Sequence, residues 1–137
     1  MRAMQGLHLT ADLRGCASTQ AAMTDLDALR RLCLGAVQSA GLLPVGELFH
    51  RFPPAPGAAA ASGITGVVLL AESHLAVHTW PELAAVTLDV YVCNFGAENS
   101  ACAHALIDAL QAAFAPAQVE RHALQRGGCA GVPDAAA

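Results

Sequence analysis

Hydrophobic and polar positions alternate along several segments of the chain, most clearly in residues 86–93. A period of two residues is typical of a β-strand with one buried face. The aliphatic set there is Val86, Leu88, Val90 and Val92, and the opposite set is Thr87, Asp89, Tyr91 and Cys93. Similar patterns predict further strands at 5–13, 42–52, 63–70 and 118–125, with a short strand through Val77 that ends near Pro81.

Two other segments repeat their apolar residues every three or four positions, which is the spacing of an amphipathic helix. The first is expected to begin at Thr24, because Thr24 and Asp27 resemble a capping box, and to end at Gly41. The second is expected to begin at Asn99 or Ser100, since both are favoured N-cap residues. Its apolar face carries Ala103, Leu106, Ile107, Leu110 and Phe114.

The order of these elements is strand, helix, several strands, helix and strand, without the regular alternation of a parallel sheet. We therefore predict an α+β fold: a two-layer sandwich in which two helices pack on one face of a mostly antiparallel sheet. The chain is long enough for one domain, 1–137, with a low-complexity loop at 53–62 and a frayed tail at 127–137. The second face of the sheet is left uncovered, so it suits a site or a partner subunit.

Composition narrows the class of protein. Hydrophobic residues make up 55% of the chain and charged residues 13%, which excludes disorder and favours extra buried surface. We therefore expect a homo-oligomer, at least a dimer. All 7 basic residues are arginine and form no cluster, and the net charge is −4, so no nucleic-acid partner is expected. The absence of lysine excludes pyridoxal phosphate, which enzymes anchor on a lysine.

No signal for secretion or membrane insertion is visible in the sequence. The first six residues lack the long apolar stretch of a secretory signal. The longest apolar stretch, 63–71, is too short to cross a bilayer, so no membrane partner is expected. The five cysteines are odd in number and lack C-x-x-C spacing, which favours reduced thiols in a cytoplasmic protein.

Residues 71–82 combine the only tryptophan with two histidines and two carboxylates in an otherwise aliphatic chain. Taken singly, a serine at a strand start is usually a turn residue, and a cysteine at a strand end is usually a small hydrophobe. His74 and His78 make a poor metal pair, because residues four apart in a strand lie about 13 Å apart, so no metal is expected. A Ser-His-Asp hydrolase is also disfavoured, because Ser73 does not lie in a G-x-S-x-G turn.

The whole segment, however, resembles the signature of the prokaryotic S-adenosylmethionine decarboxylase proenzymes. It reads Glu72-Ser73-His74-Leu75-Ala76-Val77-His78-Thr79-Trp80-Pro81-Glu82. Flanking blocks agree with that family in order and spacing: His8-Leu9, Phe49-His50-Arg51-Phe52, Gly63-Ile64-Thr65-Gly66-Val67-Val68 and Leu88-Asp89-Val90-Tyr91-Val92-Cys93. The resemblance extends from about residue 6 to about residue 127, and a signature this long is far more specific than a short motif.

The resemblance implies a pyruvoyl-dependent enzyme that is made as an inactive zymogen. The Ser73 hydroxyl attacks the Glu72 carbonyl, and the resulting ester eliminates into a β chain, 1–72, and an α chain, 73–137. A pyruvoyl group then replaces Ser73, forms a Schiff base with S-adenosylmethionine and accepts the electrons left by carbon dioxide. The product, S-adenosylmethioninamine, is the aminopropyl donor for spermidine and hence polyamine biosynthesis.

The same resemblance implies roles for six other residues. Thr65 and His78 assist the self-cleavage. Cys93 is the proton donor to the substrate carbon after decarboxylation. Glu82 binds the ribose hydroxyls, while Phe52 and Trp80 stack on the adenine, where aromatic faces also favour the cationic sulfonium.

The chain departs from the family pattern at several positions. Thr65 stands where many relatives have serine but keeps a hydroxyl, Asn94 replaces a common glycine, and Asp12 stands where glutamate is usual. The loop at 53–62 is longer than in short relatives. Ser73 and His78 are five residues apart, so a regular strand would direct them to opposite faces. We therefore expect a bend or bulge between them, or a Ser73 that lies outside the strand.

Two other functions remain open at this point. The same scaffold and pyruvoyl chemistry would suit a decarboxylase of ornithine or arginine, although the acidic and aromatic binding residues favour a nucleoside substrate. A binding protein that never cleaves is the alternative from another class. The joint presence of Ser73, His78 and Cys93 argues against it.

Overall fold

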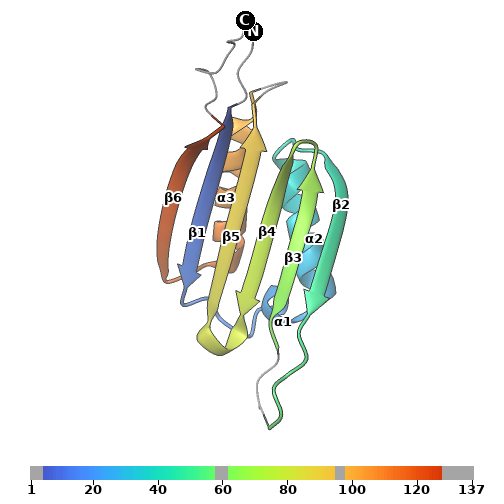
Figure 1. The fold of residues 1–137 in the computed structure, drawn as a ribbon. Helices are drawn as coiled ribbons and strands as arrows, with labels where there is room; N and C mark the ends of the chain where they lie inside the picture. The colour runs from blue at the N-terminus through green and yellow to red at the C-terminus, as the bar shows by residue number, and fades with distance from the viewer. Residues whose placement is uncertain (1–4, 58–61, 95–97, 128–137) are drawn as a thin grey trace, which may run out of the picture.

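The computed structural model describes residues 5–57, 62–94 and 98–127. They form one antiparallel sheet of six strands in the order β2-β3-β4-β5-β1-β6 (Figure 1). The strands are β1 (Gly6–Arg14), β2 (Pro44–Arg51), β3 (Ile64–Leu70), β4 (Ser73–Trp80), β5 (Ala85–Cys93) and β6 (Gln118–Arg126). The antiparallel sheet that the sequence predicted is confirmed, and β1 lies between β5 and β6 although it comes first in the chain.

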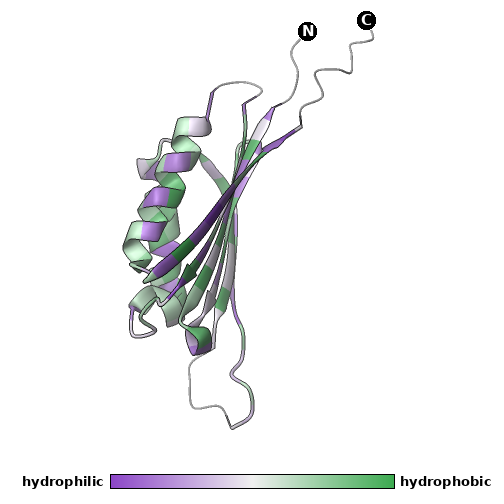
Figure 2. Ribbon diagram, turned by 90° about the vertical axis from the view of Figure 1, so that its left-hand side faces the viewer, coloured by the Kyte–Doolittle hydropathy of each residue, from purple (hydrophilic) through white to green (hydrophobic). Residues whose placement is uncertain are grey.

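Two long helices, α2 (Leu26–Ser39) and α3 (Ser100–Phe114), pack against the sheet together with a short helix, α1 (Ala21–Thr24). Figure 2 shows all three on the same side of the sheet. Helix α2 contacts β2 and β3, and α3 contacts β1 and β5. None of the helices within the described ranges is long and apolar enough to cross a membrane.

The core lies between the helices and the sheet, and alternate strand residues build it. All four aliphatic residues predicted to face inward on β5 are buried, at 0–2% relative exposure. They meet Leu7, Leu9, Ala11 and Leu13 of β1 and the predicted apolar face of α3. Because full burial of one such side chain is worth about 1.5–3 kcal/mol, this layer supplies most of the force that holds the helices on the sheet.

The opposite face of the sheet, which we call the open face, carries the other alternate residues. On the four central strands they are Thr65, Val67 and Leu69 of β3, His74, Ala76 and His78 of β4, Thr87, Asp89 and Tyr91 of β5, and His8, Thr10 and Asp12 of β1. No helix of the described residues covers them (Figure 2). The open face is thus a mixed polar and apolar surface, to which these four strands contribute the histidines His8, His74 and His78.

The helical start differs from the sequence prediction. Thr24 ends α1, and the N-cap of α2 is Asp25, whose carboxylate accepts hydrogen bonds from the N–H groups of Asp27 (3.0 Å) and Ala28 (3.4 Å). Asp25 is extended, with φ −103° and ψ 113°, so it separates the two helices. Asp25 competes with Thr24 for the cap position, and its carboxylate is at least as good an acceptor.

Strand β4 contradicts the expected bend. Its pairing with β3 runs without a register shift from Leu70 opposite Ser73 to Thr65 opposite His78. Ser73 is the first residue of the strand, and no bulge separates it from His78. By strand alternation Ser73 shares the helix-side face with Leu75 and Val77, whereas His78 lies on the open face, so the expectation that a bend would bring the two side chains to one face was wrong. Other expectations, for the loop at 53–62 and the tail at 127–137, lie partly outside the described residues.

Candidate active site

Ser73 follows a two-residue turn that joins β3 to β4. Because Leu70 pairs with Ser73, only Ala71 and Glu72 form the turn. Glu72 has a φ of 65°, in the left-handed region that glycine favours. The peptide bond between Glu72 and Ser73 therefore lies at one end of the sheet, next to a residue with an uncommon backbone conformation.

The neighbouring strand holds the Ser73 side chain in place. The backbone N–H of Cys93, at the end of β5, donates a hydrogen bond to the Ser73 Oγ at 3.2 Å. This bond uses one lone pair of the hydroxyl oxygen, so the hydroxyl proton remains available to a base. The fold thus brings together two residues that the sequence had assigned to one site.

Cys93 is almost buried, at 8% relative exposure, and the segment after it is anchored to α3. The Asn94 amide nitrogen donates to the Ser100 Oγ (3.0 Å), and its amide oxygen accepts from the Asn99 N–H (2.7 Å). Asn99 in turn donates to the Cys93 carbonyl (3.0 Å). Asn94 does not have a positive φ, so this position does not require the common glycine, and its side chain fixes the backbone beside the thiol.

Further along β4, His78 lies opposite Thr65 of β3 on the open face. The Thr65 Oγ1 and the His78 Nδ1 are 3.0 Å apart, which is hydrogen-bond distance. Either group can donate, because the direction depends on the imidazole tautomer. With Nδ1 held by the hydroxyl, the Nε2 of His78 is the ring atom left for proton transfer. Threonine therefore supplies the hydroxyl that serine supplies in many relatives.

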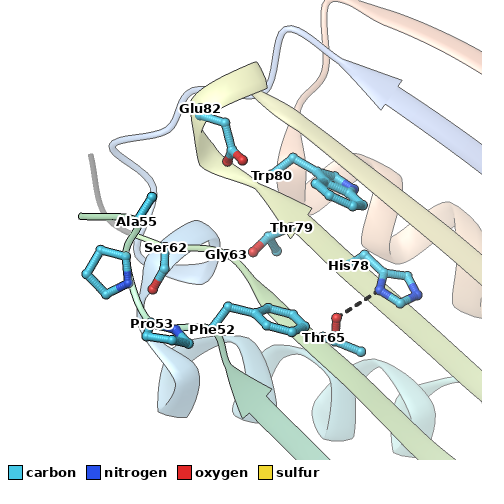
Figure 3. Close-up of a pocket in the computed structure, with 11 residues that line it drawn as sticks. Phe52, Pro53, Ala55, Ser62, Gly63, Thr65, His78, Thr79, Trp80 and Glu82 are labelled. Atoms are coloured by element: carbon cyan, nitrogen blue, oxygen red, sulfur yellow. Dashed lines mark hydrogen bonds between the residues drawn. The ribbon is translucent and has the colours of Figure 1, made fainter. Parts of the chain in front are cut away.

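A cavity of about 500 Å³ opens beside this pair, at the opposite end of β4 from Ser73. It is lined by Phe52, Pro53, Pro54, Ala55, Ser62, Gly63, Thr65, His78, Thr79, Trp80 and Glu82. In Figure 3, Phe52 and Trp80 lie on either side of Thr79, and the carboxylate of Glu82 lies on the same side as Trp80. Two aromatic rings and one carboxylate in a cavity of this size suit a flat aromatic ligand that also carries hydroxyl groups.

The buried Thr79 holds the floor of the cavity. Its hydroxyl donates to the Met23 carbonyl (2.9 Å) and accepts from the Ile64 N–H (3.0 Å), which ties β4 to both α1 and β3. A Cβ at Gly63 would collide with the Thr79 carbonyl oxygen, so only glycine permits this close approach. The sequence prediction missed Gly63 and Thr79 as cavity residues, since their role depends on a contact between neighbouring strands.

A short 3₁₀ helix, η1 (Pro81–Leu83), positions one acidic and one aromatic residue of the cavity, Glu82 and Trp80. It begins directly after Trp80, with Pro81 at the first position, where its fixed φ suits a helix start. It ends at Ala84, which is left-handed and donates its N–H to the Pro81 carbonyl (3.2 Å). Glu82 lies in this single turn, two residues after Trp80, and both residues line the cavity.

The candidate residues therefore form two groups at opposite ends of β4. The cleavage group comprises Glu72, Ser73 and Cys93. The pocket group comprises Phe52, Thr65, His78, Trp80 and Glu82. Five residues of extended strand separate Ser73 from His78, or roughly 17 Å at about 3.4 Å per residue. Within one chain, the fold does not bring the two groups together.

A further cluster, which the sequence analysis did not identify, lies on the open face beside the cleavage group. The His8 Nε2 is 3.1 Å from the Asp89 Oδ1, the rings of His74 and Tyr91 are 5.8 Å apart, and the Arg126 guanidinium lies 5.4 Å from the Tyr91 ring. Burial lowers the pKa of His74, the charges of His8 and Arg126 lower it further, and Asp89 opposes them. Finding this cluster requires the strand order, which the alternation of a single strand does not contain.

Among the described residues, the other cysteines and the metal-binding residue types give no second site. Cys33 lies in α2, where burial raises the pKa of its thiol to about 12, so it stays protonated and unreactive. Cys16, Cys33, Cys93 and Cys102 are free thiols. Within the described ranges, no three His, Cys, Asp or Glu residues are grouped so that they could hold a metal ion.

Comparison with known proteins gives a consistent result. Residues 7–127 match the family model described as S-adenosylmethionine decarboxylase. An S-adenosylmethionine decarboxylase proenzyme from Aquifex aeolicus is 34% identical over 122 residues, covering 89% of this chain and 81% of the relative. One from Symbiobacterium thermophilum is 36% identical over 123 residues, covering 89% and 83%.

The similarity extends to a solved structure. The crystal structure of the adenosylmethionine decarboxylase from Aquifex aeolicus superimposes with a TM-score of 0.78 at 30% identity, covering 98% of this chain and 97% of that one. An archaeal proenzyme from Methanococcus maripaludis is 30% identical and covers 89% of both chains. The matched family model includes every residue of the cleavage and pocket groups. This chain therefore belongs to the S-adenosylmethionine decarboxylase family.

Proposed function

We propose that this protein cleaves itself between Glu72 and Ser73 and then decarboxylates S-adenosylmethionine. The observation that carries the proposal is the hydrogen bond from the Cys93 backbone N–H to the Ser73 Oγ, which fixes the hydroxyl next to the backbone of the residue that carries the thiol. Relatives that are 34% and 36% identical are named S-adenosylmethionine decarboxylase proenzymes, which implies maturation by cleavage. The product is the aminopropyl donor for spermidine biosynthesis.

Cleavage begins with a shift of the acyl group from nitrogen to oxygen. The Ser73 Oγ bonds to the Glu72 carbonyl carbon, the bond from that carbon to the Ser73 nitrogen breaks, and the hydroxyl proton ends on the nitrogen. Loss of the Ser73 Cα proton and cleavage of its Cβ–Oγ bond then release the Glu72 carboxylate and leave a dehydroalanine. This enamine becomes an imine, and water hydrolyses the imine to the pyruvoyl carbonyl and ammonia. The pyruvoyl group that results supplies the carbonyl that a chain without lysine cannot obtain from pyridoxal phosphate.

Cys93 is the proposed proton donor of the decarboxylation. The substrate carbon that loses carbon dioxide would need a proton at that position, and Cys93 would be the residue that supplies it. A thiol is a weak acid that can supply this proton near neutral pH when it lies within reach. The low exposure of Cys93 and the three hydrogen bonds that anchor residues 93, 94 and 99 to one another and to α3 support a fixed donor.

The pocket group is proposed to bind the nucleoside of S-adenosylmethionine. Phe52 and Trp80 offer aromatic faces for the adenine, and these faces also attract a cationic sulfonium. Glu82 is placed to accept hydrogen bonds from two ribose hydroxyls, since a carboxylate has two acceptor oxygens. The cavity volume of about 500 Å³ falls in the range of small-molecule sites.

We further propose a two-fold symmetric dimer in which the open faces of two copies meet. Binding and chemistry act on one substrate, yet the two groups lie roughly 17 Å apart within a chain. A two-fold axis that turns β4 of one copy against β4 of the other would bring each pocket group to the end of the second copy's sheet, where the turn that contains Glu72 and Ser73 lies. Thr65 and His78 would then assist the cleavage of the other chain.

Exposed apolar side chains on the open face support this dimer. Leu48 is 69% exposed, Leu124 55% and Leu69 50%, and the half-exposed rings of Phe52 and Trp80 lie at one end. An uncovered apolar surface of this kind marks an interaction site more often than a solvent face. Sedimentation at micromolar concentration is expected to give a dimer or a larger symmetric assembly, and a stable monomer would contradict the proposal.

The function is tested by intact mass and by a substrate panel. The purified protein should contain two chains, 1–72 and 73–137, the second with a blocked N-terminus, whereas Ser73→Ala should stay uncut. Release of labelled carbon dioxide should occur with S-adenosylmethionine and not with ornithine or arginine. Release of carbon dioxide from ornithine or arginine would support the pyruvoyl chemistry but assign a different substrate. A chain that stays intact and inactive would support the alternative of a binding protein that never cleaves.

A further inference from the structure

Three non-glycine residues of the described chain have a positive φ, and only one of them lacks a capping role. Ala84 (51°) and Ala115 (48°) are the left-handed C-caps of η1 and α3, where this conformation closes a helix. Glu72 (65°) follows strand β3 and caps no helix. The end of a helix therefore does not account for the left-handed conformation of Glu72. Glu72 is also the residue directly before the proposed scissile bond.

The turn that contains Glu72 is also of an unfavourable kind for a hairpin. Two-residue hairpin loops favour type I′ and II′ turns, which need a positive φ at the first loop residue. Here the first residue, Ala71, has no positive φ, and Glu72 does. A positive φ at the second residue alone is the pattern of a type II turn, which favours glycine or asparagine at that position. A glutamate there is strained.

The structure around the turn prevents it from relaxing. The Leu70–Ser73 pair closes one side of the hairpin, and the pairing of β4 with β5 holds the strand that follows. The hydrogen bond from the Cys93 N–H holds the Ser73 Oγ as well. Strain that persists at one residue while its surroundings are fixed is typical of functional positions.

We propose that the left-handed backbone of Glu72 promotes self-cleavage by straining the peptide bond that is cut, an inference that rests on the proposed function. In the amide, two bonds join the Glu72 carbonyl carbon to the Ser73 Cα. In the ester, three bonds join them, through Oγ and Cβ. The acyl shift thus lengthens the turn by one bond, and Glu72 can leave the left-handed region. Strain is present before the reaction and is released as the ester forms.

The test compares Glu72→Gly with Glu72→Ala. Both variants remove the carboxylate of an exposed side chain, and they differ in the backbone cost of a positive φ. We expect Glu72→Gly to cleave about five- to tenfold more slowly than Glu72→Ala, measured as the half-life of the intact chain. A tenfold change corresponds to about 1.4 kcal/mol. In a Ser73→Ala background, which stays uncut, the glycine variant should also unfold at a higher denaturant concentration than the alanine variant.

Ala115→Gly is the matched control, because it relieves a left-handed alanine at the end of α3, far from the turn in sequence. It should raise stability and leave the cleavage rate unchanged. Equal or faster cleavage of Glu72→Gly would overturn the proposal. Slower cleavage without a gain in stability would also overturn it, because the glycine would then act by loosening the turn. If the unaltered chain stayed intact, the proposed function itself would fail.

Discussion

The cleavage group and the pocket group are held by different kinds of interaction. Backbone features position the cleavage group: a two-residue turn, the left-handed Glu72 and an amide hydrogen bond from Cys93. Side chains position the pocket group, which rests on the buried hydroxyl of Thr79 and on the turn of η1. The proposed scissile peptide bond and the proposed substrate cavity are therefore positioned by independent sets of interactions. Each can be damaged without the other, and variants can separate them.

The largest expected effect comes from mixing two inactive variants. Ser73→Ala lacks the nucleophile, and His78→Ala lacks the imidazole that is proposed to assist cleavage, so each alone should stay uncut. When the two are co-expressed with different tags, half of the sites in a mixed dimer have both residues removed and half have both intact. The His78→Ala chain should then be cut, and mass spectrometry of each tagged chain measures this.

This experiment separates assembly from chemistry. An uncut His78→Ala chain in a proven mixed dimer would mean that His78 acts within its own chain or from another arrangement. Cleavage of His78→Ala on its own would show that the His78 imidazole is not needed for self-cleavage. If the His78→Ala chain is cut only in the mixture, the pocket group of one copy acts on the cleavage group of the other copy.

Replacement of Cys93 should affect turnover and leave cleavage intact. Cys93→Ala keeps the backbone N–H that holds the Ser73 Oγ, so we expect both chains to form. Decarboxylation should fall on the order of 10²-fold or more, as is typical when a positioned acid is removed. Residual turnover should end in faster inactivation. Rates of product formation and loss of activity over time measure both effects.

Cys33→Ala controls for the loss of a thiol in general. Cys33 is fully buried in α2 with a pKa raised to about 12, so its removal should lower the free energy of unfolding more than the rate. If Cys93→Ala turned over S-adenosylmethionine at the parent rate, the proton-donor role would pass to Tyr91 or His78. Tyr91 lies on the same face, two residues before Cys93.

Local patterns in the sequence predicted most of the fold. The alternation in 86–93 correctly separated the buried and open faces of β5, because side chains in a strand alternate regardless of which strands are neighbours. The apolar face of α3 was predicted for the same reason. The break at Asp25 was not predicted, because Thr24 and Asp25 are both good caps and only the packing of α1 under Thr79 distinguishes them.

The sequence predicted which residues form the candidate site but did not predict how they are arranged in space. The resemblance named Ser73, His78 and Cys93 together, and the sequence alone led to the expectation of a bulge that would join them. The regular pairing of β4 rules out such a bulge, and the dimer proposed above, which no pattern within one chain contains, is what would bring these residues together. The cluster around Tyr91 was missed because it spans β4, β5, β1 and β6, whose order follows from tertiary structure.

At the pocket end, Glu82→Gln should weaken substrate binding and leave self-cleavage unchanged. The amide keeps the size of the side chain but loses the negative charge that strengthens the proposed hydrogen bonds from the ribose hydroxyls. Hydrogen bonds to a charged group are worth about 1.5–3 kcal/mol, so the KM for S-adenosylmethionine should rise about 10- to 100-fold, with a smaller change in kcat. Asp108→Asn, an exposed carboxylate on α3, is the control. Equal KM values for Glu82→Gln and the parent would remove Glu82 from the binding site.

The smallest expected effect is a pH dependence of stability at the cleavage end, due to His74. Burial lowers the pKa of its imidazole in the folded protein, and the charges of His8 and Arg126 lower it further. The unfolded chain, in which histidine titrates near 6.5, therefore binds a proton more readily than the folded chain. Stability from this residue is fully present above about pH 6.5 and is lost as the pH falls below that value toward the lowered pKa.

His74→Gln should remove this part of the pH dependence. Urea unfolding of the uncut Ser73→Ala protein, with and without His74→Gln, would be followed between pH 7.5 and 5 at one protein concentration. When the pH is lowered from 7.5 to 5, the parent should lose more of its free energy of unfolding than His74→Gln does, because the glutamine does not titrate. His104→Gln, on the exposed side of α3, controls for the loss of an imidazole. Parallel curves for the parent and His74→Gln would show that neither burial nor the charges of His8 and Arg126 lower the pKa of His74 in the folded protein, and the cluster beside Ser73 would then act only as packing around the Tyr91 ring.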